Sequence, residues 1–243
     1  MITTPSPPPL TAEAVRHCLG KFNLGPIDLT LGAAQCVALA GGNGAGKSTL
    51  LRCLAGLLIP NHGTVAVFGS AVSGLRRGRQ LAFLPERFSP PHYLTGREYL
   101  DYYLGLCGMR QMPSRELLQT LNLDPALLSR PVRRLSKGTA QKLGLAAVLA
   151  TNRPLLLMDE PFSGLDPEAR QGLRAAMEAY VQHGGSLLFS THLFEGMDHL
   201  IARLLILHAG QLRFDGSPID CCQQARQETL ELAFLHHIRQ GIN

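Results

Sequence analysis

The sequence predicts an α/β fold, in which a mostly parallel sheet is combined with an antiparallel β region and an inserted α-helical subdomain. Short apolar runs alternate with segments of helical spacing, and this alternation is typical of parallel strands joined by covering helices. Strand signals are missing from residue 94 to residue 150, and the stretch AGQLRFDG predicts a β-hairpin after the last apolar run. The runs that predict strands are residues 35–40, 80–84, 155–158, 186–189 and 204–207.

The length of 243 residues and the composition, 45% apolar and 17% charged, indicate a globular protein with one large core or at most two small ones. The first residues are rich in proline, threonine and serine, which predicts a disordered tail. The stretches REYLDYYLGLCG and AQKLGLAAVLA predict helices of the inserted subdomain. We expect a tail over residues 1–11 and one domain over residues 12–243, divided into a sheet-containing core (12–86 and 151–218), the helical subdomain (87–150) and a C-terminal helical segment (219–243).

Charge and cysteine content limit the classes of function. The net charge of +5 is dispersed, apart from short clusters such as Arg76-Arg77-Gly78-Arg79 and residues 130–134. A solvated face, or a patch near acidic lipid headgroups, explains these clusters more simply than nucleic acid does. The six cysteines form no C-x-x-C pair, which indicates reduced thiols in the cytoplasm. No apolar run is long enough to cross a bilayer, and the N-terminus lacks the plan of a signal peptide.

The glycine-rich stretch GGNGAGKSTLL follows the first apolar run and precedes a segment of helical spacing. Without Cβ atoms the backbone can curl so that its N–H groups converge on phosphate oxygens, and the following helix adds its dipole. The pattern predicts a phosphate-binding loop (P-loop), and together with the predicted sheet it indicates the core of a P-loop NTPase. We expect Lys47 to reach the β- and γ-phosphates, Ser48 to offer its hydroxyl to Mg²⁺, and Thr49 to lie near the α-phosphate. A Gly-rich turn with an incidental lysine is the alternative. The loop residues are Gly41, Gly42, Asn43, Gly44, Ala45, Gly46, Lys47, Ser48 and Thr49.

Two carboxylates follow the apolar run in the stretch LLLMDEP. The run predicts a buried strand, and Asp159 stands at its C-terminal edge, where ligands of open α/β sheets gather. Asp159 can hold Mg²⁺ through water, and Glu160 can accept a proton from an attacking water. The alternative is that both residues simply end a strand.

A third motif, Leu135-Ser136-Lys137-Gly138-Thr139, precedes a predicted helix upstream of LLLMDEP. Together with the GGNGAGKST loop, the SGLD stretch ending at Asp166, and Ser190-Thr191-His192, it forms an ordered set of motifs. This set resembles the nucleotide-binding subunit of an ATP-binding cassette (ABC) transporter, and the resemblance covers the chain from about residue 14 to residue 218.

The resemblance implies ATP and Mg²⁺ as cofactors and a division of labour between two copies. In this family the signature loop of one subunit closes on the γ-phosphate bound to the other, so Ser136 and Gly138 would act in trans. A helix N-terminus binds anions, which fits this role, and an ordinary N-cap serine is the alternative. His192 resembles the switch histidine that contacts the γ-phosphate and orients the water, whereas a lone histidine at a strand end is usually structural. Asp166 would communicate across the dimer and, followed by Pro167, would also cap a helix.

Some positions depart from the family pattern. Lys137 stands where the commonest signature has glycine, and Thr139 where it has glutamine, but the serine and the second glycine remain. In FLPERFSPP the chain has Glu86 where the family usually carries glutamine. A carboxylate there can still approach Mg²⁺, although its negative charge is repelled by a triphosphate. A glutamate after Leu-Pro resembles the residue that many bacterial export-type ATPase subunits carry at this position. Phe22 is the best candidate for the aromatic that stacks on adenine, and a core or surface phenylalanine is the alternative.

We therefore expect an ATP-binding and ATP-hydrolysing subunit that pairs with a second nucleotide-binding subunit and powers a separate transmembrane permease, for export rather than import. The protein would lie at the cytoplasmic face of the inner membrane, contact the membrane only through the permease near residues 83–93, and bind no nucleic acid. Two alternatives stay open. One is a soluble ABC ATPase that remodels nucleic acid or ribosomes, which the lack of a long basic segment disfavours; the other is a membrane-associated ABC regulator that moves no solute.

Overall fold

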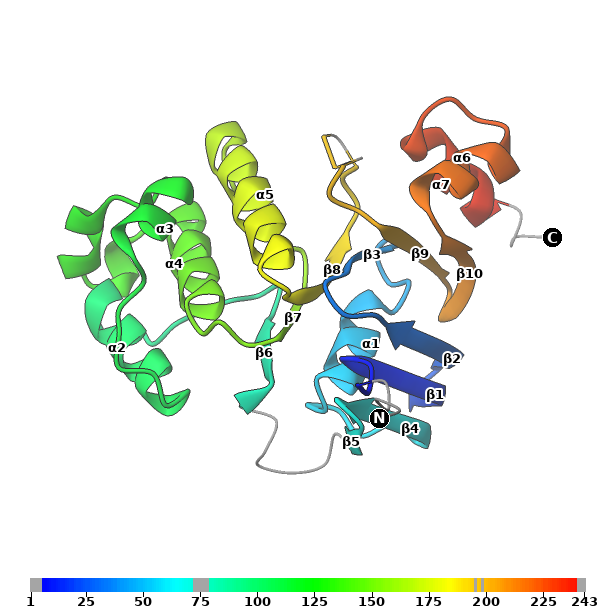
Figure 1. Cartoon of the computed structure of the whole chain (residues 1–243), viewed down its shortest axis with the longest axis horizontal. Coiled ribbons are helices and arrows are strands. Elements are labelled where there is room, and N and C mark those ends of the chain that lie inside the picture. The colour runs from blue at the N-terminus through cyan, green and yellow to red at the C-terminus, as the bar shows by residue number, and fades with distance from the viewer. Residues whose placement is uncertain (1–5, 72–78, 195, 198, 240–243) are drawn as a thin grey trace, which may run out of the picture.

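The computed structural model describes residues 6–71, 79–194, 196–197 and 199–239. Within these residues, a central sheet of six strands has the order β10-β9-β3-β8-β7-β6, and its neighbouring strands are parallel except for β9 and β10 (Figure 1). The mostly parallel sheet predicted from the apolar runs is confirmed. Its strands are β3 (Cys36–Ala40), β6 (Leu81–Leu84), β7 (Leu155–Met158), β8 (Ser186–Thr191), β9 (Arg203–His208) and β10 (Gln211–Gly216).

The central strands are mostly apolar, and both faces of the sheet are covered. Every residue of β3, β7 and β8 is buried. Successive side chains alternate between two cores: Val37 and Leu39 belong to one, and Ala38 and Ala40 to the other. A strand buried on both faces appears as a continuous apolar run, which is why these strands can be found in the sequence.

A second, antiparallel sheet has the order β2-β1-β4-β5 and carries the antiparallel region of the predicted fold class. Helix α1 (Lys47–Leu54) contributes Leu50, Leu51 and Leu54 to the core that this sheet shares with one face of the central sheet. The strands of the second sheet are β1 (Leu10–Leu19), β2 (Phe22–Leu31), β4 (His62–Val67) and β5 (Ser70–Ala71).

The N-terminal boundary differs from the expected one. Residue 10 lies within the predicted tail, yet β1 begins there, and Leu10 is fully buried in the core opposite Leu31. Pairing with two neighbouring strands and burial of Leu10 stabilise this end of the chain. Residues 1–5 of the predicted tail and the basic cluster at Arg76 and Arg77 lie outside the described residues.

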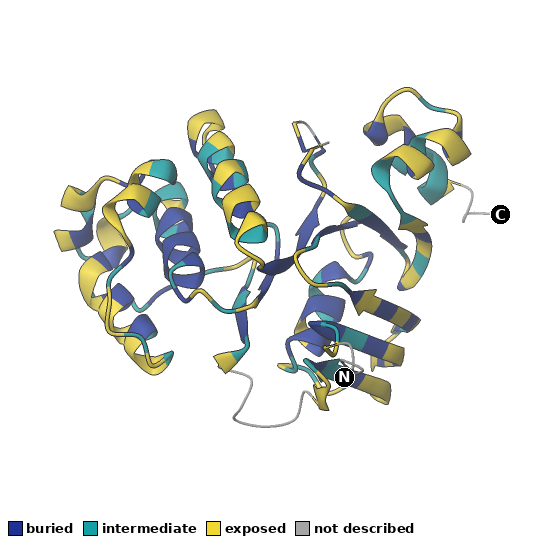
Figure 2. Ribbon diagram, viewed as in Figure 1, coloured by how far each residue is buried: buried dark blue, intermediate teal, exposed yellow. Residues whose placement is uncertain are grey.

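The inserted subdomain is helical, as predicted. Its helices are α2 (Gly96–Leu106), α3 (Arg115–Thr120) and α4 (Lys137–Leu149), with short 3-10 turns at Pro125–Ser129 and Val132–Arg134. A capping box, in which Thr95 and Glu98 satisfy each other's backbone N–H groups, begins α2. Figure 2 shows α4 buried along most of its length, because this helix is apolar on nearly every side and lies beneath the others.

The remaining helices cover the sheet and close the chain. Helix α5 (Pro167–Gln182) follows β7, and α6 (Pro218–Ala225) and α7 (Leu230–Arg239) follow the β9–β10 hairpin. Both residues of the hairpin turn, Ala209 and Gly210, have positive φ (47° and 79°), as tight two-residue hairpin turns require. The hairpin and the C-terminal helical segment are therefore present as predicted. Figure 1 shows the helical subdomain and the α6–α7 pair at opposite ends of the molecule.

Candidate functional site

The predicted motifs gather where parallel strands of the central sheet end. The phosphate-binding loop follows β3, Glu86 comes two residues after β6, Asp159 and Glu160 follow β7, and His192 follows β8. These four strands lie side by side in the order β3-β8-β7-β6 with the same direction. The carboxyl ends of parallel strands meet at one edge of a sheet, so motifs far apart in the sequence come together here.

The loop after β3 depends on glycine at two positions. Gly46, the N-cap of α1, has φ of 106°, and a Cβ at this residue would lie 2.7 Å from the ring of Phe22. A Cβ on Gly41 would lie 2.5 Å from the carbonyl oxygen of Leu207. Side chains at either position would open the loop, so the glycines keep the backbone curled at the start of the helix. A backbone curled in this way at a helix N-terminus is suited to binding phosphate.

Three charged or titratable side chains are connected beside the loop. Lys47 Nζ lies 2.7 Å from the carbonyl oxygen of Gly41 and 3.3 Å from Glu160 Oε1. The other carboxylate oxygen, Glu160 Oε2, lies 2.9 Å from His192 Nδ1. Lys47 and Glu160 are nearly buried, with side chains 8% and 12% exposed, whereas the His192 side chain is 55% exposed. The structure thus brings together the predicted phosphate-binding lysine, the predicted base and the predicted switch histidine.

Asp159 is completely buried behind Glu160. Its Oδ1 accepts a hydrogen bond of 2.6 Å from the hydroxyl of Ser190, whereas its Oδ2 is buried with no hydrogen-bond partner among the described residues. A buried carboxylate oxygen without a partner is costly, and a hard cation or its water would satisfy it. Ser48, on the loop itself, lines the cavity and carries a hydroxyl that could serve as a further oxygen ligand. The residues present therefore fit a magnesium ion bound together with phosphate.

A cavity of about 620 Å³ lies over the loop. Phe22 and Glu86, both predicted site residues, line it together with the loop, Glu160 and His192. Three lining residues, Leu19, Arg87 and Ser163, were not expected. Leu19 pairs with Phe22, Arg87 follows Glu86, and Ser163 begins the SGLD stretch, but none of the three was itself predicted as a site residue.

The signature residues lie outside this cavity. Ser136 is the N-cap of α4, where its Oγ accepts a hydrogen bond of 3.1 Å from Thr139 N, and it lines a neighbouring groove of about 550 Å³. Gly138 allows a close backbone approach, since a Cβ there would lie 2.8 Å from the carbonyl oxygen of Gly164. Neither residue is among those that line the phosphate-loop cavity of its own chain.

Asp166 is also outside the cavity, and it caps α5 as the sequence predicted. Its Oδ1 accepts a hydrogen bond of 2.8 Å from Ala169 N, and its Oδ2 lies 2.9 Å from Lys142 Nζ. The backbone N–H of Ala169, followed by the Lys142 ammonium, lowers the pKa of the Asp166 carboxyl. The residue has a local structural role in this chain, in addition to any role across a dimer.

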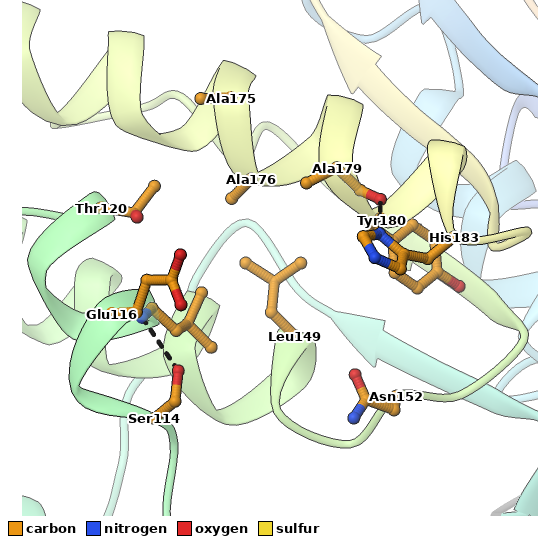
Figure 3. A pocket seen from close by; sticks show the side chains of 11 residues that line it. Ser114, Glu116, Thr120, Leu149, Asn152, Ala175, Ala176, Ala179, Tyr180 and His183 are labelled. Atoms are coloured by element: carbon orange, nitrogen blue, oxygen red, sulfur yellow. Dashed lines mark hydrogen bonds between the residues drawn. The ribbon is translucent and has the colours of Figure 1, made fainter.

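A second cavity, of about 430 Å³, lies between α3 and α5 and contains none of the predicted site residues. Figure 3 shows its wall of small side chains along α5, formed by Ala175, Ala176 and Ala179, with Glu116 facing them from α3. The cavity is a cleft between packed helices, and its lining residues do not include a cluster of charged side chains. The cavity over the phosphate loop is therefore the candidate site.

The chain matches a known protein family. The profile of the family described as "ABC transporter" matches residues 24–163. The chain belongs to the ABC transporter family. No helix in the described part of this ABC protein has the length and apolar character needed to span a membrane.

Relatives with assigned names are ATP-binding proteins. The cytochrome c biogenesis ATP-binding export protein CcmA of Xanthomonas oryzae pv. oryzae is 34% identical over 209 residues, which cover 84% of this chain and 96% of that protein. The Nod factor export ATP-binding protein I of Sinorhizobium fredii is 34% identical over 82% of this chain. The chain spans only 59% of the length of that protein, and 58% of an uncharacterised ABC transporter ATP-binding protein of Nostoc that is 32% identical.

Solved structures share the fold. The structure of an ATP-binding subunit of an ABC transporter superposes with a TM-score of 0.85 at 28% identity and covers 94% of this chain and 98% of that chain. The dimeric ATP-binding cassette MJ0796, bound to ADP and Pi, has a TM-score of 0.76 at 21% identity over 86% of this chain and 98% of its own. This second likeness concerns the fold alone.

Proposed function

We propose that this ABC protein binds and hydrolyses ATP and that it powers a separate membrane-embedded permease. One observation carries the proposal: Lys47, Glu160 and His192 are joined by contacts of 3.3 and 2.9 Å beside a loop shaped to hold phosphate. A binding module that only held nucleotide would need the loop and the lysine, but it would have no use for a nearly buried carboxylate paired with a histidine.

Each residue has a distinct part in the proposed reaction. The loop N–H groups and Lys47 hold the β- and γ-phosphates and stabilise the charge that spreads over the γ-phosphoryl group. Glu160 accepts the proton of the attacking water, and His192, 2.9 Å from that carboxylate, orients the water and contacts the γ-phosphate. Ser48 and Asp159 would hold Mg²⁺, which when bound neutralises phosphate charge. Phe22 and Glu86 line the cavity; Phe22 would stack on adenine, and the Glu86 carboxylate would be a further candidate to hold the metal.

The proposed active form is a head-to-tail pair of cassettes. Ser136 and Gly138 lie at the N-terminus of α4, and a helix N-terminus is suited to binding anions. However, neither residue lines the phosphate-loop cavity of its own chain. A second copy would bring these residues to the γ-phosphate held by the first. ATP then bridges the two copies, and hydrolysis weakens the bridge and favours the open pair.

Two relatives and one residue support export as the direction of transport. The Xanthomonas and Sinorhizobium relatives are both named as export proteins, and Glu86 after Leu-Pro agrees with export. The permease would bind near residues 83–93, beside the groove that Ser136 lines. On this proposal the protein works at the cytoplasmic face of the inner membrane, where it contacts the bilayer only through the permease.

Phosphate release from MgATP by the purified chain tests the enzymatic part of the proposal. Wild type should hydrolyse ATP, and Glu160→Gln should lose most of the activity while it still binds ATP. Glu168→Gln is a matched control, because Glu168 lies in the first turn of α5 and bonds only to Asn122 in the described structure. Equal activity of wild type and Glu160→Gln would remove Glu160 from the role of base.

Purification from native membranes tests the partner. A polytopic membrane protein should accompany the chain, and its amount should not depend on nuclease treatment. RNA or DNA in place of such a protein would instead indicate a soluble ATPase that remodels nucleic acid.

A further inference from the structure

The hydroxyl of Ser190 joins the two acidic residues of the site. Ser190 is the fifth residue of β8 and is completely buried. Its Oγ donates a hydrogen bond of 2.6 Å to Asp159 Oδ1 and accepts one of 2.8 Å from Glu160 N. The directions are fixed, because a backbone N–H can only donate, so the hydroxyl proton must point to the carboxylate. One small side chain thereby connects both residues that follow β7 to the neighbouring strand.

Glu160 needs such a connection because its backbone is in an unfavourable conformation. Its φ is +48°, in the left-handed region where residues with a Cβ are strained. The ladder between β7 and β8 ends at Met158 and Phe189, and Asp159 N still bonds to the Leu84 carbonyl of β6. Glu160 N is the next group along the chain, and its hydrogen bond goes to Ser190 Oγ. Strain of this kind persists only where surrounding contacts hold it.

The held conformation determines where the Glu160 carboxylate lies. From this backbone position the carboxylate reaches Lys47 Nζ at 3.3 Å and His192 Nδ1 at 2.9 Å. If the backbone of Glu160 relaxed, its side chain would start from a different position and point in a different direction. The contacts of the carboxylate with Lys47 and His192 would then lengthen. A shift of about 1 Å in a reacting group can cost about 10²-fold in rate.

We propose that Ser190 is a positioning residue for ATP hydrolysis: its hydroxyl holds Glu160 in the strained conformation that directs the carboxylate to the reaction, and it fixes the neighbouring Asp159 at the same time. This inference rests on the proposed function. The alternative is that Ser190 only stabilises the fold. Another buried serine of β8 serves as a control for this alternative. Ser186, at the other end of the same strand, is equally buried and accepts a hydrogen bond of 3.1 Å from Ala34 N.

Steady-state hydrolysis and ATP binding by single variants separate these roles. Ser190→Ala removes both hydrogen bonds, and we expect kcat to fall about 10- to 100-fold while the KM for MgATP and the dissociation constant for ATP without Mg²⁺ change less than about twofold. Ser190→Cys keeps the side-chain volume but bonds weakly, so its kcat should resemble that of Ser190→Ala. Ser186→Ala removes one hydrogen bond, so it should lower the melting temperature, though less than Ser190→Ala does, and leave kcat within about twofold of wild type.

A double variant tests whether Ser190 acts through Glu160. Once Glu160→Gln has removed the base, the position of that side chain no longer matters, so Ser190→Ala should lower the residual rate less than about threefold. The full 10- to 100-fold loss on this background, a Ser190→Cys variant with wild-type kcat, or a matching loss of ATP affinity would each overturn the proposal. A wild type without ATPase activity would refute the proposed function itself, whereas an active wild type with an equally active Ser190→Ala variant would refute only the role of Ser190.

Discussion

Replacing Lys47 by alanine removes an ammonium that the structure surrounds on nearly every side. Its Nζ lies 2.7 Å from the carbonyl oxygen of Gly41 and 3.3 Å from Glu160 Oε1, and the side chain is 8% exposed. A hydrogen bond that involves a charged group contributes about 1.5–3 kcal/mol, so one such bond to a phosphate corresponds to roughly a 10- to 150-fold change in the dissociation constant of ATP. We expect the affinity of Lys47→Ala for ATP to fall within or beyond this range.

The same substitution also affects folding, so the binding measurement needs a control. Removing one partner of a buried ion pair costs about 3–5 kcal/mol, and we expect the lower end here because His192 still pairs with Glu160. Lys142→Ala is the matched control: this lysine is also nearly buried and ion-paired, to Asp166, but does not line the cavity. It should lower the melting temperature and leave ATP affinity within about twofold of wild type.

Titration with a fluorescent ATP analogue at low protein concentration, together with thermal melts without nucleotide, distinguishes the two effects. Unchanged ATP affinity in Lys47→Ala would contradict the assignment of the phosphate loop. An equal loss of affinity in Lys142→Ala would show that damage to the fold, rather than a lost phosphate contact, explains the result.

Three further outcomes can be measured. Glu160→Gln should lower turnover by about 10²- to 10⁴-fold and leave equilibrium ATP binding intact, and single-turnover kinetics would show whether the chemical step is the one that slows. Gly138→Ala places a Cβ 2.8 Å from the Gly164 carbonyl oxygen, and such overpacking costs about 1–3 kcal/mol; calorimetry should show lower stability, and hydrolysis should fall more than ATP affinity of the single chain. Contacts with Ala169 and Lys142 lower the pKa of Asp166, so they stabilise the fold above the unfolded-state pKa of about 3.9 and this contribution is lost as pH falls through the lower folded-state value. Asp166→Asn should therefore show a shallower drop in melting temperature between about pH 5 and pH 2, and an unchanged slope would refute this attribution.

The central strands could be predicted from the sequence because burial on both faces leaves an uninterrupted apolar run, as in Leu155–Met158. The antiparallel sheet has weaker signals for physical reasons. In β1 the pairing register shifts between Ala12 and Val15, and Ala14 has φ of +47°, so the alternation of apolar and polar residues is broken there. The tail prediction failed at residue 10 because the stability of that end comes from partner strands distant in the sequence.

Some residues of the candidate site could also be predicted from the sequence, and others could not. Lys47, Asp159, Glu160 and His192 each follow or begin an element whose pattern can be recognised locally, so their positions could be predicted. Ser190 stands in the motif Ser190-Thr191-His192, but its own role could not be predicted from composition or spacing, because it depends on Asp159, 31 positions away in the sequence, becoming its neighbour when β7 pairs with β8.

The claim that two copies complete one ATP site is tested most directly by the mass of the Glu160→Gln variant in solution. Analytical ultracentrifugation with saturating ATP and Mg²⁺ should show a dimer, and omission of ATP or the added change Ser136→Glu, which brings a carboxylate against the γ-phosphate, should leave a monomer. A variant that binds ATP and stays monomeric at high protein concentration, or that dimerises equally well with Ser136→Glu, would contradict the account.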